Sequence, residues 1–505
     1  MRLFNSARQY HQRTRFSFNS VKEVYREVIP DDKKLPVKQY TGKPTIDLPR
    51  DFELDRGNLD KEFQQILKFR KFHRLQSDRI PIEDLSHLLH ASNGITLEKE
   101  TGGKKLYYRA SPSASSTYPV EIYVVANQVE NLESGLYYYH PVNHQLVEIQ
   151  KGNIQDDITT ACFNLESIQQ APLFILFSGI YDRNRWRYQD RAFRYTLMET
   201  GYILENLALA GACLDYHVNI IGDFVDDAVN RILQIDSEEE AGLLVTAIGK
   251  SGGKIVEESY TFSMPGESDD TLQTNLENMQ ASFYRQSSHY PADEKAVNIQ
   301  VRLPFEKVAG ERITPSDLIG LPDDPGQRLS KSTLQTIENR RSAHFFNRTS
   351  INVTHLSALL HQLQNIPALY NYQAFHTYLV SNDVENLTHG LYRYFPQFHQ
   401  LQLIKRGTYR GDISYLTLAQ DAVFNCSVAF FFAVDFEEID IFSNRGYRYA
   451  HFNVGMLSEA IYVAGTGMEL AVRGISNFFD DDLNNFFSMQ SPSKQILGGV
   501  IVGRS

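Results

Sequence analysis

Cysteine is scarce in this chain, and none of its cysteines is spaced for a disulfide framework or a metal site. Cys162, Cys213 and Cys426 stand far apart in apolar surroundings, whereas disulfide scaffolds and zinc sites need several cysteines at short spacings. We therefore expect reduced core thiols. The 15 histidines show no two-ligand spacing within one helix, so no metal site is predicted.

Long apolar runs and basic clusters are also missing. The N-terminal stretch MRLFNSARQYHQRTRF lacks the apolar core of a signal sequence, and the most apolar segment, residues 422–434, is too short to span a bilayer. The formal net charge is -11 and no long Lys/Arg run occurs, which argues against a nucleic-acid partner. We expect a cytoplasmic protein with neither membrane nor nucleic acid as partner.

Glycine-rich GxGxxG and Walker motifs are absent as well, so a separate dinucleotide-binding domain is not implied. What the chain does have is size and apolar content. Its 505 residues are 42% apolar and 12% aromatic, which is enough to fill the cores of two large folded units.

An internal repeat dominates the sequence. YVVANQVENLESGLYYYHPVNHQL (123–146) and YLVSNDVENLTHGLYRYFPQFHQL (378–401) match at most positions, at an offset of 378 − 123 = 255. Further matches join 190–209 to 444–463, 220–230 to 474–484 and 247–250 to 501–504. Each copy spans about 180 residues, too long for a solenoid unit of roughly 20–50 residues. The chain therefore contains a duplicated domain.

The pattern within each copy predicts an α+β fold. In the first copy, residues 122–127 alternate as a strand, 135–149 predict two short strands around a Pro/Asn turn, and 171–180 predict a buried strand. Residues 194–214 carry apolar side chains at helical spacing and predict a central core helix. We expect an N-terminal arm (1–55), two domains (56–255 and 329–505) and a polar, exposed linker between them (256–328).

The copies differ most where the first has a hydroxyl-rich loop. Arg70 to Gly135 covers 135 − 70 = 65 positions, but the matching Arg340 to Gly390 covers only 390 − 340 = 50. The fifteen missing residues fall where the first copy has RASPSASSTYP (109–119). An ordinary serine-rich turn is the alternative for this stretch, and a solvated helix start is the alternative for Arg340 and Arg341.

Taken in order, the motifs resemble the SagB-type dehydrogenases of the FMN-dependent nitroreductase superfamily. The resemblance rests on Arg-Arg-Ser at 340–342, Pro-Ser-Ala at 112–114 leading into YPVEIYVV, GLYYY at 135–139, RYQDRAFRY at 187–195, METGYILENL at 198–207 and IGDFVDD at 221–227. It implies two tandem nitroreductase-like α/β sandwich domains that form an intramolecular pseudo-dimer, so that the chain acts as a monomer, with FMN at the interface of the halves.

The resemblance also implies which residues form one flavin site. From the second copy, Arg340, Arg341, Ser342 and His344 would hold the phosphate, with Arg504 as a further cation and Ser476 and Asn477 near the flavin N5 edge. From the first copy, Pro112, Ser113 and Ala114 would cover the isoalloxazine ring. The mirror site would pair Arg70, Phe72 and Arg74 with a copy that lacks the loop, and it is expected to be empty.

Arg187 and Tyr188 stand where the family has a Lys-Tyr pair that handles a proton during substrate oxidation. A guanidinium stays protonated at neutral pH, so Tyr188 is the catalytic candidate for proton exchange and Arg187 would polarise it or orient a carboxylate. A surface loop is the alternative for this pair. Residues shared by both copies are interpreted as structural: Arg191 and Arg194 as ion pairs, and Asp226, Asp227, Asp480 and Asp481 as helix caps.

The leading hypothesis is an FMN-dependent oxidoreductase that transfers hydride between flavin and a small molecule or azoline-containing peptide, with NAD(P)H as a candidate electron donor. The alternative is a non-catalytic pseudoenzyme that uses the duplicated scaffold to bind a partner peptide or enzyme. The Lys-to-Arg replacement and the altered second copy favour that alternative.

Overall fold

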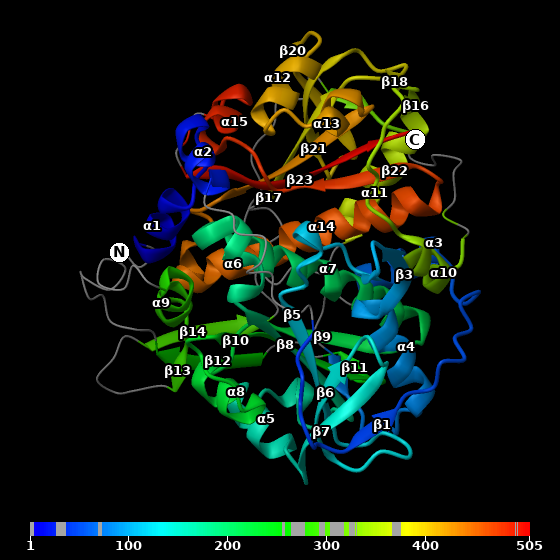
Figure 1. The fold of residues 1–505 in the computed structure, drawn as a ribbon, viewed down its shortest axis with the longest axis vertical. Helices are drawn as coiled ribbons and strands as arrows, with labels where there is room; N and C mark the ends of the chain where they lie inside the picture. The colour runs from blue at the N-terminus through cyan, green and yellow to red at the C-terminus, as the bar shows by residue number, and fades with distance from the viewer. Residues whose placement is uncertain are drawn as a thin grey trace.

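The structure, a computed structural model, describes residues 5–26, 37–68, 73–254, 258–263, 278–291, 298–303, 318–322, 329, 331–365, 375–489, 491 and 493–505. Two seven-stranded antiparallel sheets enclose a layer of helices (Figure 1). Among the described helices, none combines the length and the apolar character needed to cross a membrane.

The two sheets have the same strand order, which confirms the tandem α+β prediction. The first is ordered β1 (Thr45–Asp47), β7 (Gln145–Lys151), β6 (Gly135–His140), β5 (Val120–Ala126), β8 (Leu173–Ile180), β10 (Glu240–Gly249) and β9 (His217–Ile221). The second is ordered β15 (Leu318–Gly320), β20 (Gln400–Arg406), β19 (Gly390–Phe395), β17 (Phe375–Ser381), β21 (Val428–Asp435), β23 (Lys494–Gly503) and β22 (Ala471–Ile475).

Central strands are apolar on both faces because both faces are covered. In β21, Phe430 and Phe432 point into the core shared by the two halves, whereas Phe431 points into a separate cluster on the outer face. Alternation places successive side chains on opposite faces, so a continuous apolar run marks a strand buried on both sides. The apolar segment 422–434 is thus largely the middle of a sheet.

Helices fill the space between the sheets and cover their outer faces. The first half contains α3 (Leu59–Lys68), α4 (Ile82–Asn93), α5 (Gln155–Ala161), α6 (Asp182–Tyr188), α7 (Ala192–Cys213) and α8 (Asp226–Leu233). The second half contains α10 (Thr333–Asn339), α11 (Val353–Gln362), α12 (Arg410–Leu416), α13 (Asp421–Asn425), α14 (Gly446–Gly467) and α15 (Asp480–Phe486). Every residue of α7 from Ala192 to Ala212 is buried, which confirms the predicted core helix.

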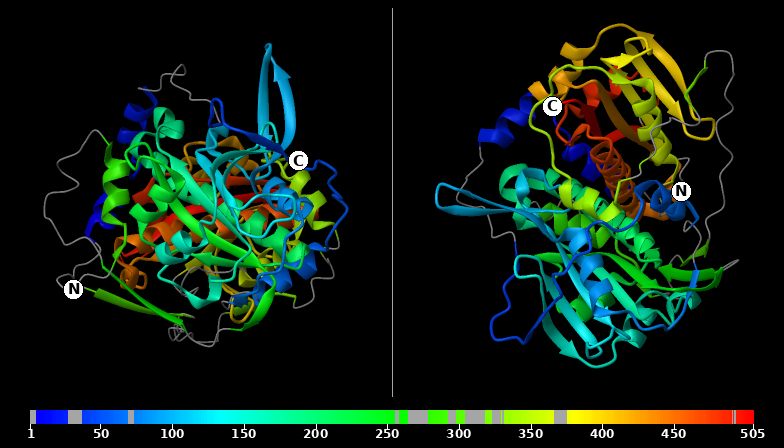
Figure 2. Two further views of the ribbon diagram at one scale, coloured as in Figure 1. Left: turned by 90° about the horizontal axis from the view of Figure 1, so that it is seen from below. Right: turned by 90° about the vertical axis from the view of Figure 1, so that its right-hand side faces the viewer.

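Smaller elements extend the two halves. A hairpin of β3 (Ile95–Thr101) and β4 (Lys104–Arg109) projects from the body (Figure 2). Further strands are β2 (His73–Leu75) with β11 (Ser251–Lys254), β12 (Glu258–Ser263) with β13 (Tyr290–Pro291) and β14 (Asn298–Leu303), and β16 (Ile351–Asn352) with β18 (Val384–Glu385).

The halves meet where α7 and α14 cross at two glycines. A Cβ atom built on Gly201 would lie 2.1 Å from the carbonyl oxygen of Phe452, and one built on Gly455 would lie 2.1 Å from that of Met198. Only glycine lets two helix backbones approach this closely. The two glycines occupy equivalent positions in the repeat, as expected of an intramolecular pseudo-dimer.

Two ion-pair clusters link the halves at the N-terminal ends of α7 and α14. Arg191 and Arg194 of the first half both contact Asp480 of the second, at 2.7 and 2.8 Å. Their repeat counterparts Arg445 and Arg448 contact Asp226 of the first half. The interpretation of the arginines as structural ion pairs agrees with this geometry, but the capping interpretation is wrong for Asp226 and Asp480, because each carboxylate binds two arginines of the opposite half.

A short segment completes each cluster, and the two segments are equivalent. The N-terminal arm, α1 (Asn5–Arg13) followed by α2 (Phe18–Arg26), lies against the second half beside α15 (Figure 1). The backbone N–H of Phe16 donates to Asp480, and that of His289, which follows α9 (Met279–Gln286), donates to Asp226, both at 2.8 Å. Tyr10 and Phe283 stack on each other at 4.6 Å.

The duplication therefore includes the arm as well as the domain. Residues 279–284, inside the segment expected to be an exposed linker, are buried in α9, so that expectation is wrong there. The reason is that α9 and Ser287, which follows it, supply to Arg448 and Arg445 the carbonyl acceptors that the arm supplies to Arg194 and Arg191. The other domain boundaries remain predictions.

Candidate active site

A cavity of about 720 Å³ opens between the two halves. Of the residues predicted for the site, Pro112, Ser113, Ala114, Arg187, Tyr188, Arg340, Arg341, Ser342, His344, Ser476 and Asn477 all line it. Its volume falls in the range of small-molecule and cofactor pockets, roughly 300–1,000 Å³. The structure thus brings together, from both halves, the residues that the resemblance grouped.

Arg504 is the predicted residue that the cavity does not include. It follows β23, and its backbone carbonyl accepts a hydrogen bond from Asn347 at 2.9 Å. Arg473, which the sequence analysis did not select, lines the cavity instead. Its counterpart in the first copy is Asn219, so a cation is present in one half and a neutral amide in the other.

Arg340 is buried in the wall that joins the halves. It is only 4% exposed, so the interpretation as a solvated helix start is wrong for this residue. Its Nε donates to the carbonyl of Ala110 at 2.6 Å, and its guanidinium lies 5.2 Å from the ring centre of Tyr462. A second nitrogen of the guanidinium, Nη1, has no hydrogen-bond partner in the described part of the chain.

A buried carboxyl lies close to this arginine. Glu459 Oε1 is 3.7 Å from Arg340 Nε, and burial raises the pKa of Glu459 to about 8 despite the neighbouring cation. Near pH 7 the carboxyl is therefore mostly protonated. The positive charge of Arg340 remains available to an anion in the cavity.

The residues that follow Arg340 present further polar groups. The Ser342 hydroxyl lies 2.9 Å from the hydroxyl of Tyr462. Arg341 is half-buried and donates to the carbonyl of Thr96 at 2.8 Å; burial and the charge of Arg340 lower its pKa. His344 is exposed at the cavity rim. A forked cation and hydroxyl donors are the groups that bind phosphate well.

The hydroxyl-rich loop is held in an unusual backbone conformation by its own side chains. Ser115, Ser116 and Tyr118 have φ values of 54°, 50° and 46°, the left-handed region that non-glycine residues seldom adopt. The Ser113 hydroxyl accepts from the N–H of Tyr118 at 2.9 Å, and Ser115 Oγ lies 2.7 Å from the Tyr188 hydroxyl. Strained residues cluster at functional sites, which favours a functional loop over an ordinary serine-rich turn.

Glu199 of α7 binds the backbone of the loop. The sequence analysis did not select this residue. Its carboxylate accepts a hydrogen bond from the N–H of Ala114 at 2.8 Å, and burial raises its pKa to about 8. The counterpart in the second copy is Asn453. The replacement of this carboxyl by an amide in the other copy was the signal that could have revealed it.

Tyr188 is buried at the end of α6, which rules out the surface-loop alternative for this residue. Its ring packs edge-on against Tyr195 at 4.6 Å. The guanidinium of Arg187 lies 5.8 Å from the ring centre of Tyr188. The hydroxyl therefore faces the loop of the first copy, with a permanent cation close to its ring.

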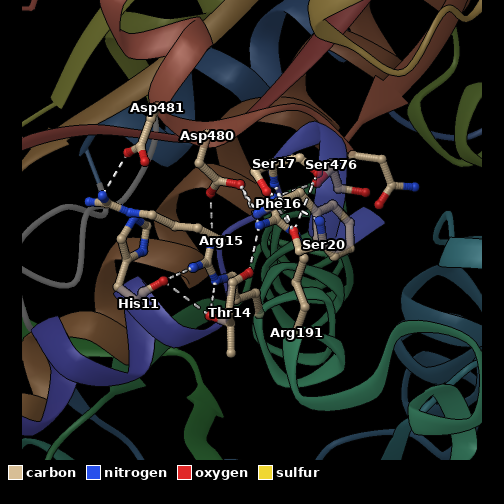
Figure 3. Close-up of polar contacts among 12 residues, drawn as sticks. His11, Thr14, Arg15, Phe16, Ser17, Ser20, Arg191, Ser476, Asp480 and Asp481 are labelled. Carbon is tan, nitrogen blue, oxygen red and sulfur yellow. Dashed lines mark hydrogen bonds and ion pairs between the residues drawn. The ribbon is translucent and has the colours of Figure 1, made fainter. Parts of the chain in front are cut away.

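Ser476 and Asn477 of the second half form another part of the cavity wall. The Tyr195 hydroxyl donates to Asn477 Oδ1 at 2.6 Å, and Arg191 donates to the carbonyl of Ser476 at 3.2 Å. Figure 3 shows Ser476 beside Arg191 and the arm residues that surround Asp480. This wall is thus continuous with one of the ion-pair clusters between the halves.

The mirror position, formed by the repeat counterparts of the cavity residues, has different side-chain contacts. Asp223, the counterpart of Asn477, is bound by the hydroxyl of Tyr260 and by His289 at 2.7 Å. Phe163, the counterpart of the cavity residue Leu418, stacks on Tyr260 at 5.0 Å. Arg70 and Phe72 lie outside the described residues, and Arg74 is exposed and paired with Glu166. Among the described residues, no group of three His, Cys, Asp or Glu side chains is arranged to hold a metal ion.

Comparison with known proteins agrees with the repeat. The chain is 31% identical over 185 residues, 37% of its length, to the putative nitroreductase MJ1384 of Methanocaldococcus jannaschii, of which it covers 88%. It is 23% identical over 146 residues, 28% of its length, to the microcin B17-processing protein McbC of Escherichia coli, of which it covers 54%. The solved structure of a putative nitroreductase from Anabaena variabilis superposes on this chain with a TM-score of 0.82 at 24% identity, and the match covers 99% of both chains.

The model of one family matches both copies. It covers residues 70–250 and 337–504, which together make up more than half of the chain and coincide with the two halves of the fold. The expected resemblance is confirmed, including its SagB-type relatives among peptide-processing proteins. With the same strand order twice and a family match over each copy, this chain belongs to the Nitroreductase family as a tandem of two nitroreductase domains.

Proposed function

We propose that this chain is an FMN-dependent oxidoreductase of the SagB type that binds one flavin between its two halves. Its family makes it an oxidoreductase. Hydride would pass between the flavin and a small molecule or an azoline-containing peptide. The peptide is favoured because one relative is named for processing microcin B17. An azoline-containing peptide would give its hydride to the flavin, with oxygen as the proposed final acceptor. If the substrate is instead an electron acceptor such as a quinone, NAD(P)H is the proposed electron donor.

The observation that carries this proposal is Nη1 of Arg340, which has no hydrogen-bond partner among the residues that the structure describes. A buried cationic nitrogen without a partner is costly, and an anionic ligand in the cavity would satisfy it. Ser342, Arg341 and Arg473 would hold the phosphate of FMN together with Arg340, and Ser113 and Ala114 would lie over its ring. When bound, the flavin supplies the two-electron chemistry that no side chain offers.

One flavin per chain is favoured by the difference between the cavity and its mirror position. Tyr260 and His289 bury the carboxylate of Asp223 where the cavity side presents Asn477 to open space. The surface that a homodimer of single domains would use is already buried between the halves, so we propose that the chain acts as a monomer.

Titration with FMN tests the stoichiometry. We expect the flavin-free protein to bind one FMN per chain, with the absorbance shift of a bound flavin and saturation at a molar ratio of about one. Anaerobic titration with NADPH and then NADH would identify the reductant by bleaching of the flavin. Uptake of two FMN per chain would contradict the single site, and absence of uptake would favour the scaffold alternative.

Tyr188 is the proposed proton-transferring group. Because the guanidinium of Arg187 stays protonated, the hydroxyl of Tyr188 next to Ser115 is the member of this pair that can give or take a proton. We expect Tyr188→Phe to lower turnover by about a hundredfold or more, with an azoline-containing peptide as hydride donor or with NAD(P)H and a quinone acceptor, while FMN affinity changes less than twofold. Ser115→Ala, which removes only the contact with the hydroxyl, should have a smaller effect. Unchanged turnover in Tyr188→Phe would remove Tyr188 from the mechanism.

A further inference from the structure

The N-terminal arm is bound to one ion-pair cluster by backbone and side-chain contacts together. Phe16 donates its N–H to Asp480 Oδ2 at 2.8 Å and accepts from the Asp480 N–H at 3.1 Å. The carbonyl of Thr14 accepts from Arg191 at 2.9 Å, and its hydroxyl accepts from Arg194 at 2.9 Å. Figure 3 shows Thr14, Phe16 and Arg191 grouped near Asp480. The arm thus fixes the position of both arginines.

Arg191 carries this contact on to the cavity. One face of its guanidinium lies 4.3 Å from the ring centre of Phe16. Its Nε donates to the Tyr195 hydroxyl at 2.9 Å, and its Nη2 donates to the carbonyl of Ser476. Tyr195 in turn donates to Asn477. Three residues of the cavity wall, Tyr195, Ser476 and Asn477, are therefore two or three contacts away from the arm.

The equivalent segment around His289 makes matching backbone contacts, but within the described residues these contacts do not lead to the cavity. His289 donates its N–H to Asp226, and Arg445 donates to Tyr449 at 3.1 Å, as Arg191 does to Tyr195. There, however, the chain of contacts ends at Asp223, which Tyr260 covers. The two segments are thus a matched pair in which only the arm reaches the cavity.

We propose that residues 5–17 of the N-terminal arm are a positioning element of the cofactor site, acting through Arg191 on Tyr195, Ser476 and Asn477. In its effect on FMN this inference rests on the proposed function. The arm contributes no group to the cavity itself; it sets the wall that the flavin contacts. Weakening the arm should therefore loosen this wall and lower FMN affinity, beyond any general loss of stability.

The test compares Phe16→Ala with His289→Ala in the full chain. We expect Phe16→Ala to raise the Kd for FMN at least tenfold and to speed hydrogen–deuterium exchange at residues 473–479 in the flavin-free protein. His289→Ala should speed exchange at the equivalent residues 219–225 and leave the Kd within twofold of the parent. Phe16→Leu, which keeps apolar bulk but loses the aromatic face, should give an intermediate result and replaces Phe16→Ala if that variant does not fold.

The outcomes separate the inference from the proposed function. If the parent protein takes up no FMN, the proposed function fails and the exchange data alone decide whether the arm positions the wall. Equal increases in Kd for the two alanine variants, or unchanged exchange at 473–479 in the Phe16 variants, would overturn the inference.

Discussion

Replacing Arg340 with alanine is expected to yield a folded protein that has lost its flavin. A hydrogen bond to a charged group contributes about 1.5–3 kcal/mol, and Arg340 would supply one to FMN while it also anchors the loop through Ala110. At about 1.4 kcal/mol for each factor of ten, we expect the Kd for FMN to rise about a hundredfold. Fluorescence titration with FMN at pH 7 measures it.

At pH 7 the loss of FMN affinity in Arg340→Ala can be assigned to the arginine itself. Since the pKa of Glu459 is raised to about 8, removal of Arg340 leaves a mostly neutral carboxyl rather than an unpaired buried charge. Arg340→Lys keeps the charge but not the fork of donors, so it should recover only part of the affinity. Two controls should leave the Kd for FMN unchanged. One is Arg348→Ala, at an exposed arginine that donates to Asn425, and the other is Arg70→Ala, at the repeat counterpart of Arg340. Equal loss in Arg70→Ala and Arg340→Ala would contradict the asymmetric site.

Replacing Gly201 with alanine is expected to force the two halves apart. The new Cβ would lie 2.1 Å from a backbone carbonyl oxygen and 2.9 Å from the Cα of Gly455, so no side-chain rotation can relieve the clash. Overpacking of a well-packed core costs about 1–3 kcal/mol and occasionally more, and backbone contact places this site at the upper end. We expect a lower unfolding midpoint together with weaker FMN binding, because α7 and α14 both line the cavity.

Two variants control for the nature of the substitution. Gly455→Ala meets the carbonyl of Met198 at the same distance and should reproduce the effect, and the double variant should be less than additive because one separation serves both. Gly411→Ala, in α12 with nothing within 4 Å of the new Cβ, should leave stability unchanged or raise it by about 0.4–1 kcal/mol. A parental unfolding midpoint for Gly201→Ala, measured by thermal denaturation, would contradict the close crossing.

Much of the fold could be predicted because it depends on local sequence patterns. Alternation in 122–127, the turn between β6 and β7, and the helical apolar spacing of 194–214 each depend on residues close in sequence. The repeat then required the second copy to adopt the same strand order. The unequal spacing before Gly135 and Gly390 pointed to the loop at 109–119, and the structure places that loop at the cavity.

Other parts of the site could not be predicted because they depend on contacts between distant segments. Glu199 resembles any polar residue in a long helix until the loop around Ala114 folds onto it. Arg473 lies on a strand whose counterpart carries an asparagine, and nothing nearby marks it as a cavity cation. The capping interpretation of Asp226 and Asp480 failed because their partners lie about 220–290 positions away along the chain.

The sequence by itself determined that two copies of one domain share this chain, that each folds as an α+β sandwich, and that the copies are unequal at one loop. Only the tertiary structure decided that residues 281–289 repeat the N-terminal arm, that arginines of each half bind an aspartate of the other, and that one interface position is open while its mirror is covered by Tyr260. The physical reason is that side-chain periodicity specifies which face of an element is buried. Which distant element covers that face depends on how the halves pack, and no local pattern records it.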